Sequence, residues 1–304
     1  MKSGLFLDRL SKKEIIISDG AFGTMLMERG LQPGTSPELF GFTHPEILKD
    51  ITQRYLDAGA EIIHSNTFGA SPVKLADYGL ENKTEEINSA AVSVVRQVVR
   101  DRGFIAASCG PSGKILKPYG DADPEILFAG FTRQIESLID SGVDIITIET
   151  MTDLKEAEIA IRAAKSVSPL TPVVATMTFE KIPRGFYTIM GVEIKEAAES
   201  LIEAGADVIG SNCGNGIEIM IEIAREFTRN TSVPVIIQSN AGMPRLQSGI
   251  LTYPETPEFF GEKTYDLISA GVSVIGGCCG TTPDHISAIK KAVVSHRGRT
   301  DSQQ

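Results

Sequence analysis

One short motif recurs four times along this 304-residue chain and limits its fold more than any other feature. In each copy a helical stretch ends at a glycine and a β-branched run follows at once, at residues 58–65, 141–148, 204–211 and 270–277. A glycine at such a point supplies the left-handed residue that ends a helix. The last three copies lie 63 and 66 residues apart, which leaves room for two strand–helix units in each interval. The motif therefore predicts a chain built from repeated strand–helix units.

Eight apolar runs are predicted to be strands, and helical patterns fill the segments between them. The runs are continuous rather than alternating, which is typical of parallel strands with both faces covered. Three predicted helices begin with a capping residue followed by proline, at residues 123–124, 256–257 and 282–283. Eight strands alternating with helices predict an α/β fold of the (β/α)8 TIM-barrel type. A doubly wound sheet is the alternative, but the sequence offers it no Gly-rich phosphate loop. The predicted strands are residues 14–18, 61–65, 104–108, 144–148, 172–178, 207–211, 234–239 and 272–276.

Composition limits the partners and the compartment. Residues 1–294 are expected to form the barrel domain, and the polar residues 295–304 a disordered tail. The net charge of −10 argues against a nucleic-acid or anionic-membrane partner. Apolar runs stay far below the ~20 residues that span a bilayer, and the N-terminus carries charges early, unlike a signal peptide. We therefore expect a cytoplasmic protein whose thiols stay reduced.

Polar residues follow nearly every predicted strand. In a (β/α)8 barrel the groups that carry chemistry lie at the carboxyl ends of the strands. Chance would scatter such residues, so their convergence on one rim indicates a functional site there. The residues are Asp19, His64, Glu149, the pair Asn212-Cys213, the pair Ser239-Asn240 and the pair Cys278-Cys279.

Cys213, Cys278 and Cys279 are the most informative of these residues. Three sulfurs with one open position are typical of a zinc site that binds and activates a fourth sulfur from a substrate. The glycines beside them let the backbone approach a ligand closely. A lone cysteine more often packs as a small hydrophobic residue, and we interpret Cys109 in that way. The spacing is not a short metal motif, so the matching strand-end positions carry the prediction.

The same rim has the features of an amino-acid site. Asp19 and Glu149 are candidates to hold an ammonium group, and the backbone N–H groups at Gly20 and Gly23 suit a carboxylate. The alternatives are that Asp19 only forms a turn and that Glu149 caps a helix or pairs with a surface lysine. His64 has no cysteine or carboxylate near it in the sequence, so we interpret it as barrel lining rather than as a zinc ligand.

Motifs at these positions resemble the zinc-dependent homocysteine S-methyltransferase family over about residues 10–294. Within the family the resemblance is greatest to the homocysteine-binding domain of cobalamin-dependent methionine synthase. The most specific motif is Gly-Gly-Cys-Cys-Gly-Thr-Thr-Pro at residues 276–283. The others lie at residues 19–24, 66–70, 110–113, 149–150, 177–180, 212–213 and 253–257.

The resemblance implies a (β/α)8 barrel in which Cys213, Cys278 and Cys279 bind Zn²⁺. It also implies that Asn240 completes the zinc shell before substrate arrives and that Asp19 and Glu149 bind the amino group of homocysteine. The remaining residues of the implied substrate site are Gly20, Ala21, Gly23, Thr24 and Asn66.

The implied activity is methylation of homocysteine to methionine, with methylcobalamin or another methylcorrinoid on a partner protein or domain as donor. The bulky segment 181–191 departs from the methionine synthase pattern, so a small donor such as S-methylmethionine or S-adenosylmethionine stays open. Two other hypotheses remain, a non-catalytic zinc-barrel module of a corrinoid system and a thiol redox sensor.

Overall fold

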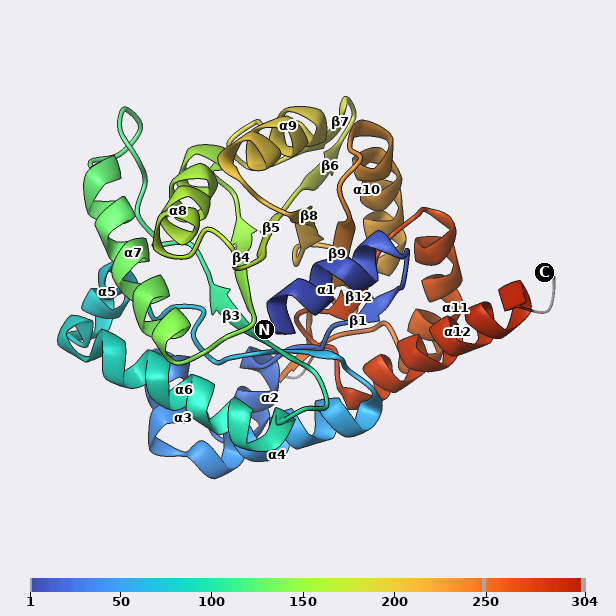
Figure 1. Ribbon diagram of the computed structural model, residues 1–304, viewed down its shortest axis with the longest axis horizontal. Helices are drawn as coiled ribbons and strands as arrows, with labels where there is room; N and C mark the ends of the chain where they lie inside the picture. The colour runs from blue at the N-terminus through green and yellow to red at the C-terminus, as the bar shows by residue number, and fades with distance from the viewer. Residues whose placement is uncertain (1, 248–249, 302–304) are drawn as a thin grey trace.

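Eight parallel strands form a closed barrel at the centre of the molecule (Figure 1). The computed structural model of the protein describes residues 2–247 and 250–301. The strand order is β1-β12-β9-β8-β5-β4-β3-β2, and a parallel bridge between Ser18 and Ile62 joins the two ends of the sheet. The predicted (β/α)8 barrel is therefore confirmed over the doubly wound alternative. The barrel strands are β1 (Ile16–Ile17), β2 (Ile62–His64), β3 (Phe104–Cys109), β4 (Ile145–Met151), β5 (Val173–Met177), β8 (Val208–Asn212), β9 (Val235–Ser239) and β12 (Val274–Gly277).

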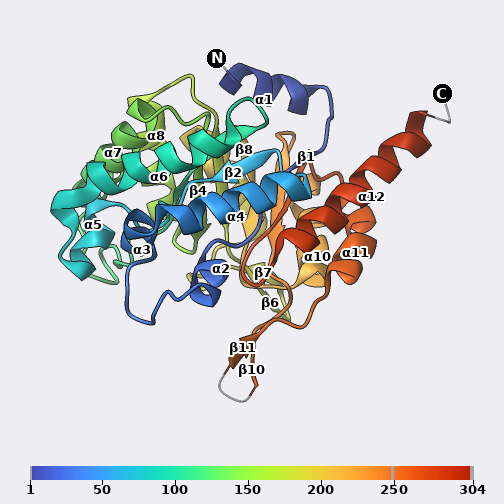
Figure 2. The same cartoon turned by 90° about the horizontal axis from the view of Figure 1, so that it is seen from below.

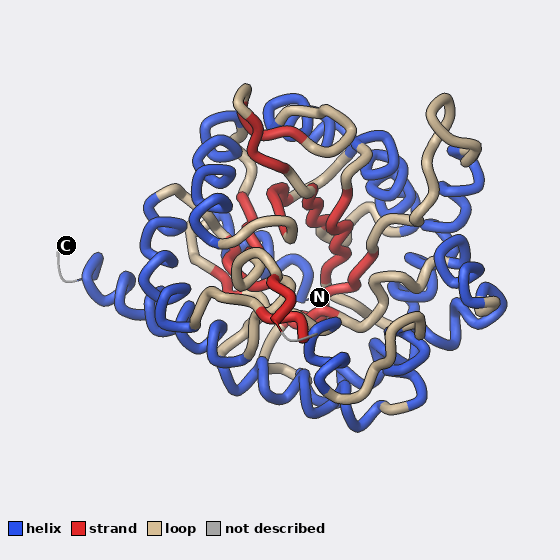
Figure 3. The backbone as a smooth tube through the Cα atoms, turned by 180° about the vertical axis from the view of Figure 1, so that it is seen from behind, coloured by secondary structure: helices blue, strands red, loops and turns tan. Residues whose placement is uncertain are grey.

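A ring of helices covers the outside of the barrel, as Figure 3 shows from behind. The predicted helix starts are confirmed for α7 and α11, where Asp123 and Thr256 accept backbone hydrogen bonds from the first turn. The glycines of the recurring motif have φ between 82° and 114°, as the left-handed end of a helix requires. The ring helices are α4 (Pro45–Ala58), α6 (Thr84–Val99), α7 (Pro124–Asp140), α8 (Leu154–Val167), α9 (Ile194–Ala204), α10 (Ile217–Asn230), α11 (Pro257–Ser269) and α12 (Pro283–Asp301).

Helix α1 (Lys2–Ser11) closes the amino-terminal end of the barrel, a feature the sequence analysis does not predict (Figures 1 and 2). Its Phe6 and Leu10 are buried in a cluster with the first inward-facing residues of the strands, such as Ile62 and Val208. Phe6 meets Phe104 of β3 edge to face, with 5.6 Å between ring centroids. The residues that can carry chemistry therefore lie at the carboxyl end of the barrel, opposite α1.

The carboxyl end of the barrel carries short additional elements. Figure 2 shows the hairpin of β10 (Arg245–Gln247) and β11 (Ile250–Thr252) at the end away from α1. The bulky segment after β5 forms a second hairpin, β6 (Glu180–Ile182) and β7 (Gly185–Tyr187). The other rim elements are helices α2 (Gly23–Glu28), α3 (Pro37–Thr43) and α5 (Pro72–Leu75) and the 3-10 turns Ala76–Tyr78 and Glu81–Lys83.

The carboxyl-terminal segment differs from the expected disordered tail. Helix α12 continues to Asp301, so most of residues 295–304 is helical, and residues 302–304 lie outside the described part of the chain. Beyond the buried Val293 the helix still contacts the barrel, since Arg297 Nη2 donates to the carbonyl oxygen of Ile15 at 2.6 Å. Within the described ranges, every helix is too short or too polar to traverse a lipid bilayer.

The barrel allows no side chain at Gly210 of β8. A Cβ added there would overlap the backbone carbonyl oxygen of Ile236 on β9. Because a backbone group cannot rotate away, Gly210→Ala should lower the free energy of unfolding by about 1–3 kcal/mol or more. Urea unfolding followed by circular dichroism measures this, with Gly4→Ala on α1, where a Cβ meets nothing within 4 Å, as the control. A Gly210→Ala midpoint equal to that of the wild type would contradict the packing described here.

Candidate active site

A cavity of about 280 Å³ opens at the carboxyl ends of the barrel strands. Ten of the residues expected at the site line it, and they come from the ends of β1, β2, β4, β8 and β12 and the loops that follow. The eleventh, Asn240, hydrogen-bonds one of the lining cysteines, Cys213. The ten are Asp19, Gly20, Ala21, Gly23, Thr24, Asn66, Glu149, Cys213, Cys278 and Cys279.

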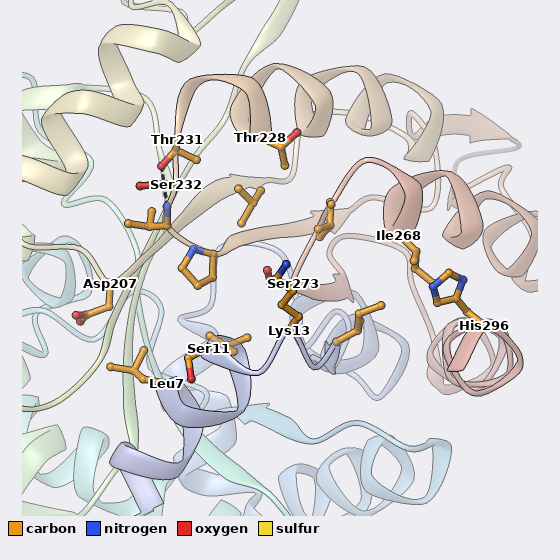
Figure 4. Close-up of a pocket in the computed structure, with 17 residues that line it drawn as sticks. Leu7, Ser11, Lys13, Asp207, Thr228, Thr231, Ser232, Ile268, Ser273 and His296 are labelled. Carbon is orange, nitrogen blue, oxygen red and sulfur yellow. Dashed lines mark hydrogen bonds between the residues drawn. The ribbon is translucent and has the colours of Figure 1, made fainter. Parts of the chain in front are cut away.

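A larger cavity of about 840 Å³ lies at the other end of the barrel, between α1 and the amino ends of β8, β9 and β12 (Figure 4). Its lining is mainly aliphatic and hydroxyl side chains, with Lys13, Asp207 and His296 as the ionisable ones. The cysteines and both candidate carboxylates lie in the smaller cavity. We therefore assign the chemistry to the smaller cavity.

The three thiols that the sequence predicts to form a metal site do come together. The sulfurs of Cys213, Cys278 and Cys279 all lie within 4.8 Å of one another, and Cys213 Sγ is 3.9 Å from Cys279 Sγ. Tetrahedral zinc with Zn–S bonds of about 2.3 Å places two sulfur ligands roughly 3.8 Å apart. The donor set and its spacing therefore fit a zinc ion.

The backbone at Cys213 is strained in a way that aims its sulfur at the other two. Cys213 has φ 61°, a left-handed value that non-glycine residues seldom adopt, and Gly214 after it has φ 74°. The Cys213 N–H donates to the carbonyl oxygen of Gln238 on β9, 3.1 Å away, which holds this turn. Strain of this kind is typical of functional sites whose surroundings fix the conformation.

Hydrogen bonds among the thiols favour ionisation at Cys213 over Cys278. Hydrogen bonds from Cys278 and then from Cys279 lower the pKa of Cys213, whereas the same contact with Cys213 raises the pKa of Cys278. One thiolate is thus stabilised by two S–H donors. A cluster that already favours a thiolate is suited to a cation, which would take the place of the shared protons.

Two further side chains contact the thiols. Asn240 is 4 % exposed and hydrogen-bonds Cys213, while its Oδ1 is buried without a partner among the described residues. Such an orphaned oxygen next to three sulfurs fits a fourth ligand to a metal, which is the role predicted for Asn240. The Tyr253 hydroxyl hydrogen-bonds Cys279, and its ring covers Gly280 so closely that a Cβ there would overlap it.

Glu149 enters the cavity through a distortion of β4. The register of β4 against β5 shifts between Ile148 and Met151, and Thr150 has φ 60°, which is an outlier for a β-branched residue. Asn212 holds this shape, because its Oδ1 accepts from the Thr150 N–H at 2.8 Å and its amide donates to Thr150 Oγ1 at 2.7 Å. The same amide lies 3.4 Å from Glu149 Oε2 and 3.9 Å from Cys278 Sγ. Asn212, to which the sequence analysis assigns no role of its own, thus connects the carboxylate with the thiols.

Burial perturbs the carboxylate of Glu149. Burial raises its pKa, while the charge of His64 and a hydrogen bond from Ser108 Oγ act in the opposite direction. The group is therefore a desolvated acceptor beside the thiols, which strengthens its interaction with a cation that enters the cavity.

Asp19 is held by His64, a residue that sequence reasoning interprets only as barrel lining. Asp19 Oδ1 is 2.7 Å from His64 Nδ1, and Asp19 Oδ2 accepts from the His64 backbone N–H, also at 2.7 Å. His64 Nε2 lies 3.2 Å from Thr147 Oγ1 on β4. Burial disfavours the charged imidazole, but the charge and hydrogen bond of Asp19 outweigh burial and raise the pKa of His64 to about 9. The positions of both residues at the ends of neighbouring strands are the signal that could have revealed the pair.

The remaining wall of the cavity is the turn after β1. Gly20 has no space for a side chain, since a Cβ would clash with Thr281 Oγ1, and the Ala21 N–H donates to that same oxygen at 3.2 Å. The Asn66 amide donates to the carbonyl oxygen of Pro37 at 2.8 Å.

Gln238 also lines the cavity, and its Oε1 is buried without a partner in the described part of the chain. Sequence reasoning missed Gln238.

Fold and site together define a class: a (β/α)8 barrel with three clustered cysteines, spaced as zinc ligands are, in a cavity that also holds carboxylates. The chain belongs to the homocysteine S-methyltransferase family, whose sequence profile matches residues 16–293.

Comparison with known proteins agrees with this assignment. The chain is 31 % identical over 306 residues to the methionine synthase of Mycobacterium leprae and 32 % identical over 308 residues to that of Mycobacterium tuberculosis. These alignments cover 94 % and 95 % of the chain but 25 % of each relative, so the chain spans about a quarter of their length. Its fold matches the metallated homocysteine methyltransferase MmuM from Escherichia coli, with a TM-score of 0.76 and 22 % identity over 93 % of this chain and 97 % of that one.

The geometry of the thiols predicts their metal dependence. Cys278→Ala removes one of the three sulfurs at the rim. Zinc affinity should fall by more than ~100-fold, the upper end of the loss seen when a residue that only orients a metal ligand is removed. The barrel should stay folded. Zinc content after dialysis against a chelator and circular dichroism measure the two effects. Cys109→Ala is the matched control, since Cys109 is fully buried outside the cluster. A folded Cys278→Ala protein with full zinc would exclude this metal site.

Proposed function

We propose that this domain is a zinc-dependent homocysteine S-methyltransferase that accepts a methyl group on the homocysteine sulfur and yields methionine. The observation that carries the proposal is the shared cavity, which the three cysteine sulfurs and the carboxylate of Glu149 line together. A molecule with a thiol at one end and an ammonium group at the other matches these two features. Membership of the family supports the same substrate.

The chain binds the amino-acid end of the substrate through Glu149 and the turn after β1. The desolvated carboxylate of Glu149 accepts a charge-assisted hydrogen bond from the ammonium group. Gly20, Ala21, Gly23, Thr24 and Asn66 surround the rest of the molecule, and Asp19, paired with His64, lines the cavity beside them. These contacts fix where the sulfur lies.

Cys213, Cys278 and Cys279 would hold the zinc ion, with Asn240 able to complete its shell before substrate enters. Bound zinc would keep the substrate sulfur in its nucleophilic thiolate form at neutral pH. The protein groups then have three tasks: to hold the ammonium group, to orient the sulfur toward the open rim and to limit access of water. No general base is needed among them once the thiol proton has left.

The methyl donor in this proposal is methylcobalamin or another methylcorrinoid carried on a partner domain or protein. The similarity to methionine synthases that are about four times longer than the matched segment supports it, since the donor-binding part would lie in the rest of such a protein. Nucleic acid and membranes are not among the proposed partners. The cytoplasm is the proposed compartment, because the three thiols must remain reduced.

Zinc analysis and calorimetry with homocysteine test the proposal directly. We expect one zinc per chain and homocysteine binding that releases about one proton and disappears on chelation. Incubation with homocysteine and methylcobalamin, S-methylmethionine or S-adenosylmethionine in separate reactions, with methionine measured by mass spectrometry, then identifies the donor. Zinc without homocysteine binding would overturn the proposed substrate, and methionine from a small donor alone would overturn the corrinoid.

Glu149→Gln keeps the shape of the side chain and removes its charge. Because a hydrogen bond to a charged group contributes about 1.5–3 kcal/mol, homocysteine affinity should fall roughly 10- to 100-fold while zinc content stays unchanged. Calorimetry on the zinc-loaded protein measures the affinity. Glu156→Gln is the matched control, since Glu156 is a buried glutamate of α8 outside the cavity. Equal homocysteine affinity in the wild type and Glu149→Gln would remove Glu149 from the ammonium site.

A further inference from the structure

His64 is a buried imidazole that lines the cavity and that the proposed mechanism does not use. Its imidazole lies between Asp19 on β1 and Thr147 on β4, and each ring nitrogen has a partner, at 2.7 Å and 3.2 Å. Asp19 engages the same residue twice, through the ring and through the backbone N–H. With 1 % of its side chain exposed, Asp19 is committed to His64.

The ionisable groups that face this imidazole set its charge. Asp19 and Glu149 both favour the imidazolium, and these two carboxylates outweigh burial. The side chains of Asp19 and His64 are 1 % and 9 % exposed, so a positive charge on the imidazole stabilises the carboxylate 2.7 Å away, because an isolated buried charge is very costly. Three carboxylates line the cavity: Asp19 is paired with the His64 imidazole, Glu38 accepts from Ser36 Oγ and the Gly69 N–H at 2.7 Å each, and Glu149 lies beside the thiols.

We propose that His64 determines substrate specificity: by pairing with Asp19 it lowers the negative charge of the cavity, so that the cavity selects a zwitterionic α-amino acid over an aminothiol that lacks a carboxylate. This inference rests on the proposed function and adds the reason for its selectivity. The substrate carboxylate enters a cavity that already holds negative charge, and the imidazolium lowers the repulsion it meets. Without His64 the carboxylates together would favour a ligand with a net positive charge.

The test compares two thiols that differ only in the carboxylate, homocysteine and 3-aminopropanethiol. Calorimetry on the zinc-loaded protein gives the ratio of their affinities for the wild type and for His64→Gln, which keeps a donor toward Asp19 but loses the charge. The preference for homocysteine should fall by about 10-fold or more, the change expected from one unit charge a few ångströms away. The control is His44→Gln, an exposed histidine outside the cavity. A merely structural role would weaken both thiols equally and leave the ratio unchanged, which would overturn the inference.

A second measurement does not depend on how well the variant folds. In the wild type, the NMR signals of the His64 imidazole should remain those of the protonated ring up to about pH 9. A neutral His64 at pH 7.5 would overturn the inference and leave the proposed function intact. Failure of the wild type to bind either thiol would instead overturn the proposed function, and this inference with it.

Discussion

The site depends on the cost of burying charge at the end of an apolar barrel, because each ionised group there must have a partner. Asp19 meets this requirement with His64, and Glu149 meets it in part with Ser108 and Asn212. The thiols meet it by sharing protons among themselves. The contacts thus leave unmatched charge at two places, Glu149 and the sulfur cluster. Those two places are the ones that an ammonium group and a metal ion would complete.

Strained backbone at two residues places the charged and sulfur-bearing side chains of the site close to one another. Thr150 and Cys213 both adopt left-handed φ values near 60°, at the ends of β4 and β8, which are strands that flank β5. Asn212 is the residue before Cys213, and its side-chain oxygen accepts a hydrogen bond from the backbone N–H of Thr150. One residue therefore connects both strained positions. Strain of about 1–3 kcal/mol at each residue persists only where the surroundings fix it. The rigid barrel beneath provides that support, with aliphatic layers closed off by Phe6 and Leu10 of α1.

Much of this architecture could be predicted from the sequence, because local rules decide it. The glycine-then-strand motif implied the parallel barrel, and the barrel in turn implied that Cys213 and the pair at 278–279 lie on one rim. The pairing of Asp19 with His64 was missed, because the two residues are far apart in the sequence and only the adjacency of the strands at whose ends they lie brings them into contact. The helical state of residues 295–301 was missed for a related reason: their polar composition suggests a tail, but α12 continues through them and Arg297 contacts the carbonyl oxygen of Ile15, which is distant in the sequence.

Asp19 and Glu149 show how neighbours separate two identical chemical groups. The sequence offers both as ligands for an ammonium group, and both line the cavity, but Asp19 also contacts the His64 imidazole at 2.7 Å whereas Glu149 lies beside the thiols. Charge counting explains why this division suits a thiolate substrate. Three cysteinates around a divalent ion carry a net charge of −1, and the substrate sulfur would add another negative charge beside Glu149. Each cation near this cluster lowers the repulsion that an incoming thiolate meets. A buried histidine is well suited to supply one, because its partner Asp19 holds it in place while it leaves the cavity open to substrate.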